Sequence, residues 1–203
     1  STTSPRRKPV VKPLSFREML VALELGIADE AVLRFIDLLS SKVPVKHGVF
    51  MHAIPQVDLF NVIYEENNSA TISNFELNTE IVFQLEDILQ KHALKNQVTQ
   101  WATVIQEGNP LKALLKEAET RNADLLVIGQ RSGTDEHGIL ARNLVRKITG
   151  NALIVPEQSP KRLQHILVPI DFSPNSIQAL QLGQALAKTA PEHFHISTLN
   201  IYE

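Results

Sequence analysis

The chain of 203 residues carries a formal net charge of −2, with 43% hydrophobic and 21% charged residues. This balance is typical of a globular protein and indicates no basic surface for nucleic acid. The chain has no cysteine, which excludes disulfides, thiolate metal sites and a cysteine nucleophile. No apolar run approaches the roughly 18 residues of a membrane span, and the start lacks a signal-peptide core. We therefore expect a cytoplasmic protein with no nucleic-acid or membrane partner.

The first segment, 1–16, is rich in Ser, Thr and Pro and contains the basic cluster Arg6-Arg7-Lys8. Its composition favours a flexible leader over a DNA contact.

Strands and helices are expected to alternate from there to residue 156. The predicted strands are 19–25, 48–54, 98–106, 123–129 and 152–156, nearly continuous in Val, Ile and Leu. The predicted helices are 29–42, 75–94, 108–122 and 139–149. This order indicates an α/β fold in which helices cover both faces of a parallel sheet, the doubly wound arrangement.

Capping residues support two of these helices. Asp29 is placed to be the N-cap of the first helix. Asn109 is placed to cap the third predicted helix, with Pro110 at its first position. In the predicted helix 75–94, one face is formed by Ile81, Leu85, Ile88 and Leu89.

The chain contains an internal repeat. The segments "MLVALELGIADEAVLRFIDLL" and "ILVPIDFSPNSIQALQLGQAL" align without gaps at an offset of 147 residues, which places Glu24 opposite Asp171. The following strands also correspond, with His52 opposite Asn200 after a one-residue slip. A repeat of this length predicts a tandem duplication. We expect a first domain over 17–156, a linker over 157–164 and the start of a second domain over 165–203, truncated after strand, helix and strand.

Three segments carry a resemblance to the universal stress protein family. "HILVPIDFSPNSIQALQLGQALA" resembles the family's first strand and helix, "EGNPLKALLKEAETRNADLLVIGQRSG" its later helix, strand and glycine loop, and "NLVRKITGNALIVP" its last helix and strand. The resemblance implies a five-stranded parallel sheet with strand order 3-2-1-4-5. It also implies an ATP site between strands one and four, and pairing between domains through strand five.

On this resemblance the candidate nucleotide-binding residues are Glu24, Gly129, Arg131, Gly133, Gly138, Asp171 and Ser173. The family's nucleotide loop reads Gly-x2-Gly-x9-Gly-Ser/Thr. Here the glycines run Gly129-x3-Gly133-x4-Gly138, with Ile139 in the Ser/Thr place and acidic Asp135 and Glu136 between. The altered loop predicts a degenerate site, with ATP and Mg²⁺ as the only cofactor that the resemblance would bring.

A purely structural role stays open as the alternative for each candidate. The glycines would serve a tight turn, Glu24 would be a solvated carboxylate, and Ser173 and Pro174 would cap a helix that Asp171 supports. Paired His193 and His195, and lone His52 and His137, are expected to be surface residues more often than metal ligands. Trp101 is expected in the core.

No nucleophile stands beside a base in any recognisable motif. We therefore expect a non-catalytic regulatory or scaffold module, with an ATP-binding protein of slow hydrolysis as the alternative. Segment Ala152–Pro156 is an apolar sheet edge, so we expect it to pair in a homodimer or with a complete second domain.

Overall fold

The computed structural model describes residues 14–54, 74–95, 97–131, 143, 146–148, 150–158, 164–189 and 195–200. It contains two compact units, Phe16–Ser159 and a unit made of Ser1–Ser15 with Pro160–Glu203. Each unit is built on parallel strands of its own.

The larger unit is built on a five-stranded parallel sheet with the predicted order β3-β2-β1-β4-β5. Its strands are β1 (Phe16–Leu23), β2 (Val45–Ile54), β3 (Gln100–Glu107), β4 (Leu125–Gln130) and β5 (Asn151–Pro156). Val21 of the central strand pairs with Phe50 on one side and with Val127 on the other, and all three are fully buried. This burial explains why these strands are almost continuously apolar.

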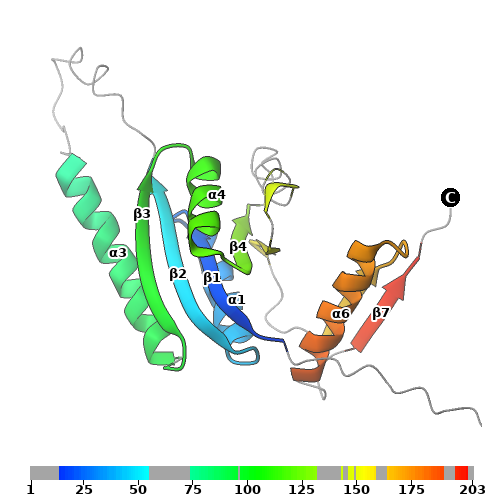
Figure 1. The fold of residues 1–203 in the computed structure, drawn as a ribbon. Coiled ribbons are helices and arrows are strands. Elements are labelled where there is room, and N and C mark those ends of the chain that lie inside the picture. The colour runs from blue at the N-terminus through cyan, green and yellow to red at the C-terminus, as the bar shows by residue number, and fades with distance from the viewer. Residues whose placement is uncertain are drawn as a thin grey trace, which may run out of the picture. The chain divides into compact units, whose positions relative to one another are not determined.

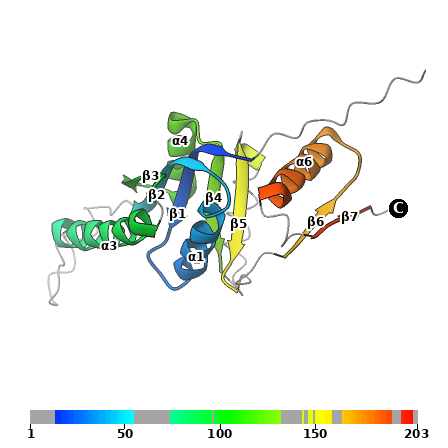
Figure 2. The same ribbon diagram turned by 90° about the horizontal axis from the view of Figure 1, so that it is seen from below.

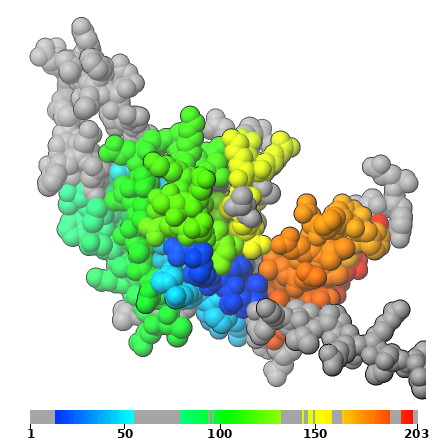
Figure 3. Space-filling view, viewed as in Figure 1, coloured from blue at the N-terminus to red at the C-terminus, as the bar shows by residue number. Residues whose placement is uncertain are grey.

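Helices cover both faces of this sheet, as Figure 2 shows. On one face lies α4 (Pro110–Arg121), and on the other lie α1 (Asp29–Ser40) and α3 (Asn74–Lys95). Beneath α4, Leu114 and Ala118 pack in one cluster with Leu20, Val49 and Leu126. In Figure 3 the green surface of α4 lies over the near side of the sheet.

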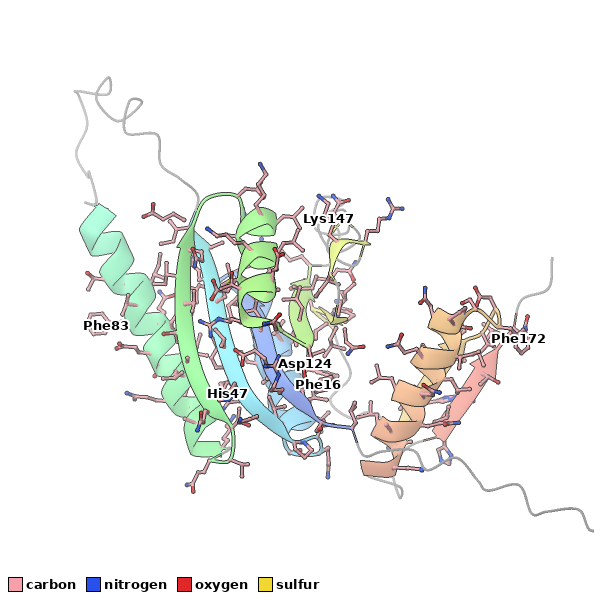
Figure 4. The ribbon with its side chains drawn as sticks, viewed as in Figure 1. Phe16, His47, Phe83, Asp124, Lys147 and Phe172 are labelled. Carbon is pink, nitrogen blue, oxygen red and sulfur yellow. The ribbon has the colours of Figure 1, made fainter. Side chains whose placement is uncertain are left out.

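The sequence signals predicted for α4 and α3 are confirmed. The Asn109 side chain accepts a hydrogen bond from the Lys112 amide at 3.2 Å, and Pro110 opens α4. On α3, Ile81 and Leu85 are buried and Ile88 and Leu89 partly so. Phe83, on the opposite side of α3, projects away from the sheet (Figure 4).

A stack of aromatic rings lies where α3 meets the sheet. Trp101 stacks on Phe50 with ring centroids 4.9 Å apart and planes 4° apart. Gly48 makes room for this ring, because a Cβ there would lie 2.4 Å from Trp101 Cζ3. Trp101 packs against the core as predicted, although it is only partly buried. Buried His92 of α3 lies against the same stack and contacts Asp37 of α1 through Nδ1, which ties the two helices together.

Asp124 closes the amino end of the sheet, beside Phe16 (Figure 4). Its carboxylate accepts hydrogen bonds from the amides of Arg17 at 2.8 Å and Glu18 at 2.9 Å. The acceptor satisfies strand amides before the ladder with β4 begins at Met19. The opposite, carboxyl end of the sheet carries the candidate site.

The smaller unit contains a βαβ arrangement: β6 (His165–Pro169), α6 (Pro174–Thr189) and β7 (His195–Leu199), with β6 and β7 parallel (Figure 1). A Cβ at Gly183 would lie 3.3 Å from Val168 Cγ2, so the glycine lets α6 approach β6 closely. The predicted partial second α/β unit is therefore present.

Candidate functional site

A cavity of about 370 Å³ lies at the carboxyl ends of the central strands in the larger unit. It lies where the strand order reverses around β1, which is where open α/β sheets bind ligands. Its volume is at the lower end of the range for small-molecule sites, roughly 300–1,000 Å³. The lining comes from β1 and the residue after it, from β2 and β4, and from the first two turns of α4: Ala22, Leu23, Glu24, Met51, His52, Ala53, Pro110, Leu114, Ile128 and Gly129.

Gly129 shapes the wall of this cavity that β4 provides. A Cβ at this position would lie 3.1 Å from Val32 Cγ2 of α1. The glycine therefore lets α1 pack closely on β4 while the other side of the strand faces the cavity. Its first requirement is helix–sheet packing within β4, and not the tight turn that was the alternative for this residue.

Glu24 and Arg131 meet across the ends of β1 and β4. Arg131 Nη2 lies 2.7 Å from Glu24 Oε2, and both side chains are part-exposed, at 44% and 39%. An ion pair this open to solvent stabilises the fold by about 0–1 kcal/mol. The pair matters more for ligand binding, because the Glu24 carboxylate beside the cavity already has the Arg131 cation next to it.

Asp29 holds the turn that presents Glu24. The prediction that Asp29 is the N-cap is wrong: Ala28 is the cap residue and Asp29 the first residue of α1. Its carboxylate instead accepts hydrogen bonds from the amides of Glu24 at 3.1 Å and Leu25 at 2.7 Å. Leu25 has φ 59°, and this left-handed turn aims both amides at the carboxylate. Burial raises the pKa of Asp29, while the backbone hydrogen bonds act in the opposite direction.

His52 lies near the carboxyl end of β2 and lines the cavity. Its Nδ1 lies 2.9 Å from the carbonyl oxygen of Leu23 on β1. A carbonyl oxygen only accepts, so Nδ1 carries a proton and donates it to Leu23. The expectation that His52 is a lone surface residue missed this position.

The predicted site residues are only partly brought together by the fold. Glu24, Gly129 and Arg131 lie at one edge of the crevice. Gly133 and Gly138, with Asp135, Glu136, His137 and Ile139, lie outside the described residues, as does His193. Asp171 and Ser173 belong to the smaller unit.

In that smaller unit the capping roles predicted for Asp171 and Ser173 are confirmed. Ser173 donates its amide to Asp171 Oδ1 at 2.9 Å, and Ser173 Oγ accepts from the Ser176 amide at 3.3 Å. The hydrogen bonds from Ser173 lower the pKa of Asp171 to about 2. Pro174 begins α6, as predicted.

The turns after β1 and β6 each contain a residue with a side chain and a positive φ. Phe172 has φ 62° directly after Asp171, as Leu25 has φ 59° directly after Glu24. Residues with a side chain seldom adopt this left-handed conformation. This uncommon φ therefore recurs at two positions that the sequence repeat aligns.

The sequence of the larger unit decides the family. Residues 19–156 match the family model described as Usp: Universal stress protein family. The chain belongs to the universal stress protein family. No curated protein sequence matches the chain significantly.

Solved structures of this family share the fold. A universal stress protein from Archaeoglobus fulgidus DSM 4304 is similar with a TM-score of 0.71 and 18% identity, over 91% of this chain and 66% of that chain. UspA from Lactobacillus plantarum is similar with a TM-score of 0.54 and 14% identity, over 70% of this chain and 98% of that one. A universal stress protein in complex with cAMP has a TM-score of 0.50 and 17% identity, over 71% and 99%.

Metal and membrane features are not found in the part of the chain that is described. Its His, Asp and Glu side chains form no group of three that could hold a metal ion. Within the same ranges, no helix has the length and apolarity to cross a bilayer.

Proposed function

We propose that this universal stress protein is a non-catalytic regulatory or scaffold module of the cytoplasm, with a nucleotide site that is degenerate on the phosphate side. The observation that carries the proposal is the pairing of Glu24 with Arg131 beside an apolar cavity. The cavity offers a place for a base, whereas the cation next to it is already paired with a carboxylate.

The base side of the site is the better supported half. Seven of the ten lining residues are Ala, Leu, Met, Pro or Ile, which suits a flat heterocyclic ring. A relative of the same fold was crystallised in complex with cAMP, a nucleotide with one phosphate.

The phosphate side of the site has fewer groups that favour an anion. The sequence that follows Arg131 adds Asp135 and Glu136 and has Ile139 where the family's loop has a hydroxyl. Two like charges about 4 Å apart near a protein surface repel by roughly 4 kcal/mol. Each further phosphate should therefore gain little affinity.

The absence of catalysis is proposed from the chemistry of the lining. None of the described lining residues is Ser, Thr, Lys or Tyr, so the cavity wall has no hydroxyl or amine nucleophile. Among the described residues, His165 Nε2 and Ser197 Oγ do lie 2.7 Å apart, but they are neighbours on the β6-β7 sheet and do not line this cavity.

An ATP-binding protein with slow hydrolysis is the second candidate. The cavity beside Glu24 favours it, since an acidic residue at the end of strand one is where the family resemblance places adenine. Titration calorimetry with Mg-ATP separates the two candidates. We expect no saturable binding in the micromolar range, and micromolar binding with slow phosphate release would replace our proposal by the second candidate.

We also propose that β6, α6 and β7 begin a second copy of the same domain. The matching turns at Leu25 and Phe172 support this. The strand registers support it as well. Glu18 pairs with His47 in the larger unit, and His165 pairs with His195 in the smaller one, as offsets of 147 and 148 residues require.

For partners we propose pairing through β5, in a homodimer or with a complete second domain. β5 ends the strand order of the larger sheet. Its residues Ala152, Leu153 and Ile154 are only partly buried. An apolar edge strand of this kind is a template for another strand.

A further inference from the structure

Two histidines are directly paired on the β6-β7 sheet of the smaller unit. His165 and His195 are Cα partners in the parallel register, and both residues are exposed. Partners in a ladder project from the same face of the sheet, and neighbouring strands lie about 4.8 Å apart. The two imidazole side chains therefore leave the sheet next to each other on one face.

Helix α6 covers the opposite face of this sheet. A Cβ at Gly183 of α6 would lie 3.3 Å from Val168 Cγ2 and 3.5 Å from Ile166 Cγ2. Strand residues alternate between the two faces, so His165 and Leu167 project away from α6. Leu167 is 58% exposed, which agrees with this direction. The paired histidines are therefore open to an ion from solvent.

A hydrogen bond holds the ring of His165 over β7. Its Nε2 lies 2.7 Å from Ser197 Oγ, and Ser197 is two residues after His195 on the same face. The His165 ring therefore leans toward the strand that carries His195. When Nε2 carries the proton of this bond, Nδ1 keeps the lone pair with which a neutral imidazole binds a metal. Metal-ligating histidines are commonly oriented by a partner on their second ring nitrogen in this way.

We infer that His165 and His195 form a two-histidine site for a divalent transition metal that prefers imidazole, of which Zn²⁺ is the example tested. Imidazole nitrogen suits Zn²⁺, Cu²⁺ and Ni²⁺, whereas Mg²⁺ and Ca²⁺ prefer oxygen ligands. Zn²⁺ binds histidine nitrogen at about 2.0–2.1 Å, so rings that leave adjacent strands about 4.8 Å apart can bind one ion together.

The pair is an open site. Among the described residues, no third His, Asp or Glu joins it, so water takes the remaining positions of a tetrahedral ion. The metal is therefore bound less tightly than in a structural site with four protein ligands. The site shares no residue with the crevice cavity and does not depend on the proposed nucleotide site.

Calorimetric titration of the full chain with Zn²⁺ tests the inference. The titration is done at about pH 7.5, because metal binding requires unprotonated imidazole. We expect saturable binding of about one equivalent below millimolar concentration, and no competition from Mg²⁺ in about ten-fold excess over Zn²⁺. Absence of saturable binding, or competition by Mg²⁺ as strong as by Zn²⁺ itself, would overturn the inference.

Single variants assign the ligands. His165→Ala and His195→Ala should each weaken Zn²⁺ binding by at least about ten-fold. His47→Ala is the matched control, because His47 has the corresponding place on β2 but its strand partner is Glu18, which contacts Arg121. This control should keep the wild-type affinity. Wild-type affinity in either of the first two variants would show that the two rings do not bind one ion together.

A measurement on the wild-type chain keeps the test independent of how the variants fold. In ¹H–¹⁵N spectra of the histidine rings, Zn²⁺ should shift the signals of two of the seven histidines together, and the variants should lack these signals. Shifts confined to one ring, or in none, would also overturn the inference.

Discussion

Glu24 of the turn after β1 and Arg131 after β4 form an ion pair of 2.7 Å across the carboxyl ends of two adjacent parallel strands. The pair joins the acidic residue that follows β1 to the cation that follows β4. In a working ATP site that cation would be free to meet the phosphates.

The variant Arg131→Gln measures what the arginine does for a ligand. In a degenerate site, its loss should change the affinities for AMP and Mg-ATP by the same factor, within about two-fold, because the arginine is already neutralised by Glu24. Calorimetry of both nucleotides checks this. A selective loss of ATP affinity, about ten-fold or more, would mean that Arg131 holds phosphates.

Arg34→Gln is the control for charge alone. Arg34 lies 3.9 Å from Glu30 on the surface of α1 and does not line the cavity. It should leave both affinities unchanged.

The variant Asp29→Ala should destabilise the larger unit and disorder the turn that presents Glu24. It removes an acceptor for two backbone amides, each hydrogen bond contributing about 1 kcal/mol, so we expect a loss of roughly 2 kcal/mol. Urea unfolding followed by Trp101 fluorescence gives this value. Asp87→Ala removes an exposed helical ion pair with Lys91 and should cost less than about 0.5 kcal/mol. Equal effects of the two variants would refute the role of Asp29 in the turn.

The fold could be predicted because it depends on signals that are local in the chain. Apolar strands alternate with capped helices, and Asn109 with Pro110 marked the start of α4 correctly. Strand β2 begins at Val45, three residues before the predicted start. The first residues of β2 were not predicted because Lys46 and His47 are polar, and a side chain near a strand end can reach solvent even in a central strand.

The site could be predicted less well because it depends on side-chain directions. Strand order alone put Glu24 and Gly129 at one crevice. The role of Asp29 was missed because it depends on the left-handed turn at Leu25, and a leucine in the sequence does not predict that conformation. The role of His52 depends on one hydrogen bond to a neighbouring strand, which no local pattern encodes.

Buried His92 predicts how stability depends on pH. Burial lowers its pKa most, and Lys95 acts in the same direction, while Asp37 opposes both. The unfolded chain, with a histidine pKa of about 6.5, therefore takes up the proton first as the pH falls. Stability should fall below about pH 6.5, by no more than ~1.4 kcal/mol for each pH unit.

Urea unfolding at about pH 7.5 and about pH 5.5 tests this, on either side of the ordinary histidine pKa. His92→Asn should lose less stability over this interval than wild type, and His47→Asn should lose as much as wild type. Parallel pH profiles for wild type and His92→Asn would exclude His92 as the cause.

The substitution Leu153→Lys tests the proposed pairing through β5. A lysine in this partly buried edge strand opposes pairing with another strand. We expect light scattering to show an assembly larger than one chain for wild type and a smaller one for the variant. A wild-type chain that is already monomeric would refute the homodimer.

The ratio of the dissociation constants for AMP and Mg-ATP tests the central claim most directly, because the two ligands share a base and differ in the phosphates. Our account predicts weak binding of both, with constants within about three-fold of each other, or less than ~0.7 kcal/mol. Mg-ATP bound at micromolar concentration, and about thirty-fold or more tightly than AMP, would contradict a site that is degenerate on its phosphate side.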